Sequence, residues 1–122
     1  MTLHPALALS GALVALSACA ADRIAPPPRP APEAATLAAV QRLAPHPCER
    51  AIAGVLTGVG IPGDSISAIT VEERREMDGD QLLGYEAWVW RTGQPGSVVV
   101  SLDAICVPYQ VYAREGARLP SR

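Results

Sequence analysis

The spacing of hydrophobic residues predicts two helices near the middle of the chain. Residues 33–44 carry hydrophobic side chains at helical spacing, namely Leu37, Val40 and Ala44. Two prolines that follow directly end this helix. Residues 48–59 match the helical period more closely, with an apolar face formed by Ile52, Val55, Leu56 and Val59. Cys48 belongs to that face, because it lies one turn before Ile52.

Alternation of apolar and polar residues predicts four strands in the second half of the chain. They cover about 65–73, 83–90, 98–102 and 106–113. The second strand has the most regular alternation, with Tyr85, Ala87 and Val89 on one face and Glu86, Trp88 and Trp90 on the other. Turn signals separate the strands at Asp78-Gly79, at the glycines and proline of 93–96 and at 103–105. Pro108 indicates that the last strand is an edge strand or carries a bulge.

The order of these elements predicts an α+β fold. One or two N-terminal helices pack on a four-stranded antiparallel meander sheet and bury one of its faces. Over residues 48–113, the helix followed by a meander, with the strand-turn sequence VVVSLDAICVPYQVY, resembles the small PepSY-type periplasmic modules. This resemblance implies a module that binds or restrains a protein partner and is not itself an enzyme.

The chain begins with an apolar segment that is too short to cross a membrane. Ala6–Ala18 contains 13 residues that are apolar or small, whereas a helix needs about 20 to span a bilayer. The length fits the hydrophobic region of a secretory signal peptide. The residues before it include no Lys or Arg, so His4 and the amino terminus supply only weak positive charge.

The segment ends in Leu16-Ser17-Ala18-Cys19, which resembles the lipobox of bacterial lipoproteins. The resemblance implies diacylglycerol on the Cys19 thiol, cleavage just before Cys19, and a mature protein with three acyl chains, which anchor stably where one chain does not. Ala20, rather than Asp, favours the outer membrane, facing the periplasm. The alternative is an ordinary signal peptide in which Cys19 is incidental.

These features divide the chain into four parts. Residues 1–18 form the signal peptide, and residues 19–32 form the lipidated cysteine and a Pro-rich tether of extended polyproline type. Residues 33–115 form the small α+β domain. Residues 116–122 form a flexible tail.

The chain contains three cysteines, so one of them has no partner within the chain. Lipidation of Cys19 would leave Cys48 and Cys106 as a pair. An exported protein meets an oxidising compartment, so the two thiols are expected to form a disulfide. The alternative is a pair of buried free thiols.

Charge and motifs exclude several classes of function. The formal net charge is −2 and no basic run occurs, so we expect no nucleic-acid partner. All ten basic residues are Arg, which excludes lysine-dependent chemistry. His46 is the only histidine after cleavage, and Asp78 and Asp80 lack the spacing of a calcium loop. No catalytic motif is present, and we expect no catalytic residue, metal or cofactor.

Trp88 and Trp90 are the strongest candidates for a binding patch, because they share the strand face opposite Tyr85. Exposed aromatic residues often mark an interaction surface. Residues that would frame such a patch are Glu86, Arg91 and Tyr112. The alternative is that the helix near 37–43, or curling of the chain, covers both indoles.

These observations predict a lipid-anchored envelope protein that acts as a non-catalytic binding or adapter module. Its partners would be the membrane, through the lipid, and an envelope protein or polymer. The alternative is a structural accessory lipoprotein of an outer-membrane assembly. An enzyme is the least supported function.

Overall fold

We describe a computed structural model of the chain, which defines residue 2 and residues 26–120. The signal segment, Cys19 and the first part of the predicted tether lie outside the described residues. The elements are α1 (Ala34–Leu43), α2 (Glu49–Gly58), the short 3-10 helix η1 (Gly63–Ser65), β1 (Ile66–Arg75), β2 (Leu82–Arg91), β3 (Ser97–Asp103) and β4 (Pro108–Arg114). Of the helices in the described part, none is long and apolar enough to cross a membrane.

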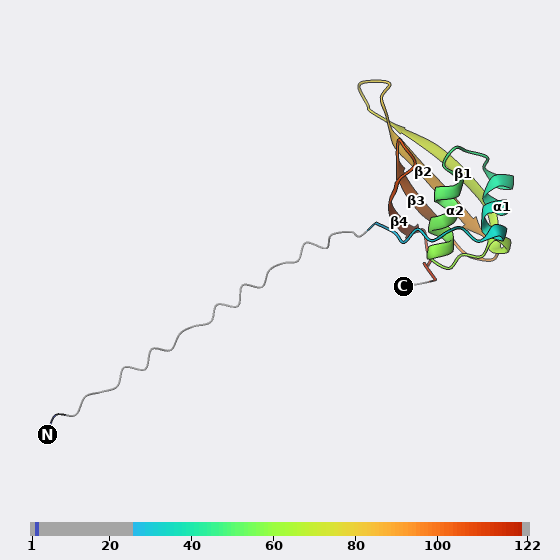
Figure 1. The fold of residues 1–122 in the computed structure, drawn as a ribbon, viewed down its shortest axis with the longest axis horizontal. Helices are drawn as coiled ribbons and strands as arrows, with labels where there is room; N and C mark the ends of the chain where they lie inside the picture. The colour runs from blue at the N-terminus through green and yellow to red at the C-terminus, as the bar shows by residue number, and fades with distance from the viewer. Residues whose placement is uncertain (1, 3–25, 121–122) are drawn as a thin grey trace.

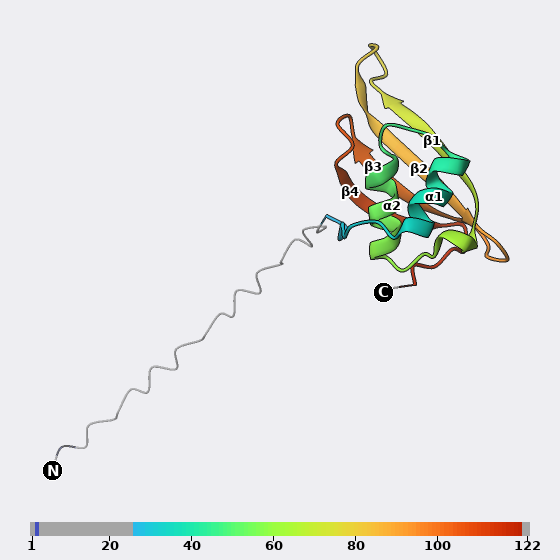
Figure 2. The same ribbon diagram turned by 45° about the vertical axis from the view of Figure 1, so that its right-hand side comes forward.

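The four strands form one antiparallel sheet in the order β1-β2-β3-β4. Both helices lie on the same face of this sheet, and the two views in Figures 1 and 2 show no described element over the other face. The predicted α+β fold, with N-terminal helices on an antiparallel meander, is therefore confirmed. We call the face of the sheet without helices the open face.

The core lies between α2 and the sheet. Its central members are almost all aliphatic because the chain contains no Phe. In α2, five consecutive residues from Ile52 to Leu56 are buried, so this helix is covered on most of its circumference. Strands β2 and β3 contribute alternate residues from the same face: Ala87, Val89, Val98, Val100 and Leu102. Burial of these side chains is the main force that holds the layers together.

The sheet differs from the sequence prediction most at two of its three hairpins, β1–β2 and β3–β4. Strand β1 continues through the charged residues to Arg75, two residues beyond the predicted end at Glu73. Strand β4 begins at Pro108, so Cys106 lies in the preceding turn and not at the start of the strand. Pro108 predicts that β4 is an edge strand or carries a bulge, and the structure shows both features: β4 pairs only with β3, and its register shifts between the partners of Ser101 and Leu102.

The described end of the Pro-rich segment packs on the domain. Residues 26–32 cross α2 on the way to α1 (Figure 1), and Pro27 is buried. Two glycines of α2 permit this approach: a Cβ at Gly54 would lie 3.1 Å from the Pro30 carbonyl oxygen, and one at Gly58 would lie 2.7 Å from that of Pro28. Residues 26–32 therefore belong to the surface of the domain, which shortens the spacer expected from the sequence.

The described end of the predicted tail also contacts the domain. Leu119 is half-buried and packs against the core, and the Ala117 backbone N–H donates to the Arg114 carbonyl at 3.1 Å. The expectation of a flexible tail from residue 116 therefore does not describe residues 116–119.

Candidate functional site

The two tryptophans lie side by side on the open face. Trp88 stands between Thr70 of β1 and Val99 of β3, and Trp90 stands between Ala68 and Ser97. Ala87 and Val89 alternate with them and enter the core beneath α2. The strand alternation predicted from the sequence is therefore confirmed, including the face assigned to each tryptophan.

Neither of the two alternatives for the tryptophans holds in full. Helix α1 packs on the opposite side of the sheet, so it does not cover them. Both indoles are nevertheless half-buried. Val99 is 0% exposed although no helix lies above it, which indicates that the large side chains of the open face cover the strand backbone and one another. The side chains of the open face therefore form a thin layer of their own over the sheet, and the outer surface of this layer is accessible to solvent.

Arg114 completes this layer from the edge strand. Its guanidinium lies over the Trp88 ring, 4.9 Å from the ring centroid. A cation above an indole is attracted by the negative face of the ring. The Trp88 Nε1–H beneath it is buried and has no hydrogen-bond partner among the described residues. The centre of the open face thus combines an aromatic surface, a positive charge and an unpaired donor.

The structure places two of the three expected framing residues on the open face. Tyr112 lies opposite Val99 on β4, and Glu86 lies opposite Ser101 on β3. Arg91 does not frame the patch, which corrects the prediction. Arg91 pairs with Ile66, a core residue, and alternates with Trp90, so it lies on the helix side of the sheet.

Two further polar residues on the open face, Arg74 and Tyr109, were not anticipated from the sequence. Arg74 donates a hydrogen bond to the Tyr109 hydroxyl, and its Nε lies 4.0 Å from a Glu86 carboxylate oxygen. These residues come from β1, β4 and β2, and Gly84 pairs directly with Arg74 across the sheet. Only strand pairing brings Arg74 and Tyr109 together, since 35 residues separate them in the chain.

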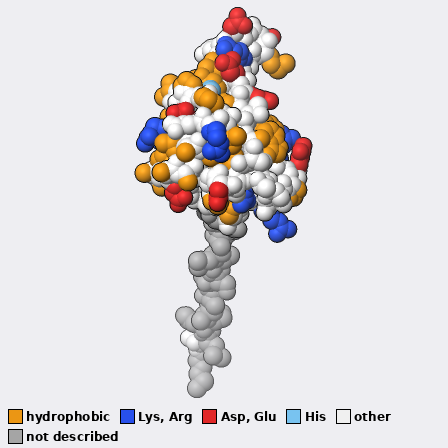
Figure 3. Space-filling view, turned by 90° about the vertical axis from the view of Figure 1, so that its right-hand side faces the viewer, with side chains coloured by type: hydrophobic (Ala, Val, Ile, Leu, Met, Phe, Trp, Pro, Cys, Tyr) orange, Lys and Arg blue, Asp and Glu red, His pale blue; other side chains and the backbone are white. Residues whose placement is uncertain are grey.

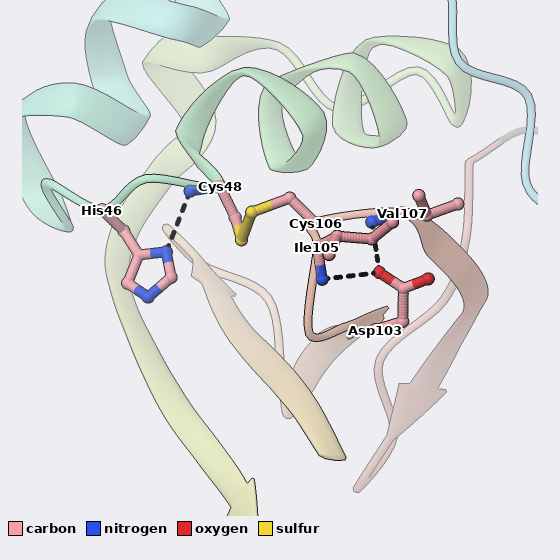
Figure 4. The surroundings of a disulfide bond; sticks show 6 residues. All are labelled: His46, Cys48, Asp103, Ile105, Cys106 and Val107. Carbon is pink, nitrogen blue, oxygen red and sulfur yellow. Dashed lines mark hydrogen bonds between the residues drawn. A yellow bond between two sulfur atoms is a disulfide. The ribbon is translucent and has the colours of Figure 1, made fainter. Parts of the chain in front are cut away.

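Cys48 and Cys106, the pair expected from the sequence, are joined by a disulfide (Figure 4). The bond connects the start of α2 to the β3–β4 turn, with Cα atoms 5.1 Å apart. The Asp103 carboxylate organises this turn by accepting backbone hydrogen bonds from Ile105 at 3.0 Å and Val107 at 2.8 Å. Cys106 adopts a left-handed conformation with φ of 66°, which the turn imposes and the disulfide holds.

His46 makes contacts that support the local structure. Its Nδ1 accepts a hydrogen bond from the Cys48 backbone N–H at 3.0 Å, and its ring meets Tyr85 edge-on with centroids 4.6 Å apart. Nε2 is therefore the nitrogen that carries the proton of the neutral ring. Within residues 26–120, no group of three His, Cys, Asp or Glu side chains is arranged to hold a metal ion.

The described cavities lie away from the open face. One of about 170 Å³ is bordered by Thr57 and Ile61, and another of about 330 Å³ lies between α1 and Asp64. Both are at the helical layer. Neither cavity is lined by Trp88 or Trp90.

Comparison of the chain with protein-family models, with curated proteins and with solved structures found no match. The resemblances to lipoproteins and to PepSY-type modules therefore rest on the residues that carry them.

Proposed function

We propose that this protein is a lipid-anchored, periplasm-facing envelope module that binds another protein through its open sheet face. The lipobox supports the anchor, and the open face supports the binding role. The single observation that carries the proposal is the Trp88–Arg114 stack between Trp90 and Tyr112 on a sheet face that no described helix covers.

The residue types of this face favour a protein partner. Trp, Tyr and Arg are the residues that most often dominate the binding energy of protein interfaces. Here they are held by strand pairing, so little conformational entropy is lost when a partner binds. Residues on the rim offer both charges and hydrogen-bond groups: Arg74, Glu86, Gln110 and Tyr109.

The proposed lipid anchor predicts that the protein is found in the membrane fraction. Cys19→Ser should release the protein from the membrane fraction, because it removes the thiol that accepts the lipid and the acyl chains that follow. Fractionation and mass measurement of the intact protein are the readouts, with Cys19→Ser compared against Ser17→Ala, which keeps the cysteine. Membrane retention of Cys19→Ser would contradict the anchor.

The open face predicts a specific contact in cells. A photo-crosslinking residue in place of Thr70 should capture one protein reproducibly, because Thr70 is exposed and neighbours Trp88. Combining Trp90→Ala with Arg114→Ala should reduce this adduct about tenfold or more, because each truncation of a central interface residue costs about 1–2 kcal/mol. Quantitative mass spectrometry measures the yield.

A matched position tests whether the contact belongs to the open face. The same photo-crosslinking residue in place of Arg42, which is exposed on α1, should not form the adduct. Thermal unfolding of the double variant checks that the domain remains folded. An adduct that persists in the double variant, or a double variant that unfolds, would refute the binding role of this face.

A further inference from the structure

The exposed hydrophobic side chains gather at one end of the sheet. The large hydrophobic residues that the structure shows as exposed are Met77, Leu83, Ile105, Val107 and Tyr109. All lie in or beside the β1–β2 hairpin and the β3–β4 turn, which an antiparallel meander places at the same end. Figure 3 shows hydrophobic atoms below the projecting hairpin. We call this set the hairpin-end surface.

The hairpin-end surface is preorganised. The Asp103 carboxylate holds the turn that carries Ile105, which is 80% exposed, and the Cys48–Cys106 bond fixes that turn to α2. Tyr109 is held by its hydrogen bond to Arg74. Exposed apolar groups on a rigid support lose little entropy on binding, whereas their exposure to water is unfavourable in the free protein.

The adjoining hairpin arm is acidic. Residues 72–80 include five carboxylates and two arginines. Both arginines are already engaged, Arg75 with Glu73 at 2.8 Å and Arg74 with Glu86 at 4.0 Å. Among the described residues, the carboxylates of the arm that form no ion pair are those of Glu72, Glu76, Asp78 and Asp80. The arm therefore places uncompensated negative charge beside the apolar groups.

We propose that the hairpin-end surface docks a basic amphipathic segment of a partner protein. The apolar side of that segment would cover Leu83 and Ile105, and its Arg or Lys residues would meet the acidic arm. This surface shares Tyr109 with the rim of the open face, but its argument does not depend on Trp88 or Trp90.

Charge favours a basic segment of a partner protein over a second copy of this chain as the occupant of the hairpin-end surface. A symmetric dimer places the same surface of each subunit against the other. The acidic arms would then meet each other or lie close together, and like charges across an interface oppose association. A basic partner instead gains from the charges that a second copy would repel.

The position of the surface also argues against the bilayer. The Pro-rich segment lies against Gly58 at the end of α2, whereas Cys48 at its start joins the β3–β4 turn. The ten residues of α2 separate these points by about 15 Å. The hairpin-end surface therefore lies away from where the chain enters the domain, and anionic lipids would repel its acidic arm.

The test uses the full chain in nanodiscs of phosphatidylcholine and two synthetic amphipathic helical peptides. The peptides have equal length and leucine content, but one carries arginines where the other carries glutamates. Fluorescence anisotropy should show about tenfold or greater preference for the arginine peptide. Ile105→Ser with Leu83→Ser should weaken its binding about tenfold, and Glu76→Arg with Asp78→Arg should remove the preference.

Control substitutions elsewhere on the domain distinguish the possible outcomes of the peptide-binding test. Asp64→Arg with Glu115→Arg makes the same change of charge away from the hairpin and should retain the preference. Trp90→Ala should leave peptide binding unchanged, which separates this test from that of the open face. Equal binding of both peptides would overturn the inference. So would self-association in sedimentation that Ile105→Ser abolishes, or partition of Cys19→Ser protein into phosphatidylcholine vesicles.

Discussion

Loss of the Cys48–Cys106 disulfide is expected to lower the free energy of unfolding by about 4 kcal/mol, because the bond closes a loop with a sequence separation of 58 residues. The cross-link removes conformations from the unfolded chain, which is the source of the stabilisation in the chain-entropy model. A typical domain is stable by only about 5–15 kcal/mol. Urea unfolding of the Cys48→Ala and Cys106→Ala double variant against the oxidised protein measures the loss.

Reduction of the disulfide provides the control for the urea unfolding experiment. Reduction should shift the unfolding midpoint of the natural chain toward that of the double variant and leave the double variant itself unchanged. Mass measurement of alkylated samples confirms the redox state. An oxidised protein and a double variant with the same midpoint would show that the cross-link does not stabilise the domain.

Gly84→Ala is expected to destabilise the domain by about 3 kcal/mol, because overpacking against rigid neighbours commonly costs about 1–3 kcal/mol and here the neighbour is backbone. A Cβ at Gly84 would lie 2.1 Å from the Leu102 carbonyl oxygen and 3.1 Å from the Asp103 Cα. The methyl group would force β2 away from β3 where Arg74 and Tyr109 meet above the sheet. Denaturant unfolding measures the change.

Gly79→Ala provides the matched control in the same hairpin. A Cβ there would have as its nearest atom a carboxylate oxygen of the Glu76 side chain, at 3.6 Å. The exposed site should tolerate the methyl group within about 0.5 kcal/mol. Equal stability of the Gly84→Ala and Gly79→Ala variants would contradict the close approach of β2 and β3.

The spacing of apolar residues along the chain predicted the fold, because these residues recur at regular intervals in the helices and strands. In α2, the apolar residues Ile52, Val55 and Leu56 recur at helical spacing. In β2, Ala87 and Val89 are buried and alternate with the half-buried Trp88 and Trp90, so the spacing in the sequence indicates which face of the strand enters the core. Short turns between consecutive strands favour a meander, since neighbours in sequence then pair in space. The start of β4 was misplaced because the Asp103 carboxylate extends the turn through two backbone hydrogen bonds.

The candidate site was predicted only in part. Alternation within one strand placed Trp88 and Trp90 together, since both belong to β2. The same alternation also argued against Arg91, which lies one residue beyond Trp90 and points to the other face. Arg114 was not predicted because its contact with Trp88 depends on the register of three strands.

The sequence by itself determined the α+β class, the meander order, the face of each tryptophan and the pairing expected for Cys48 with Cys106. These properties follow from spacing along the chain, which local steric and hydrophobic forces control. Tertiary structure alone decided that Arg114 covers Trp88, that the Pro-rich segment packs on Gly54 and Gly58, and that the exposed apolar residues share one end of the sheet. Each of these depends on strand register or layer packing between residues distant in the chain, and no local pattern encodes such contacts.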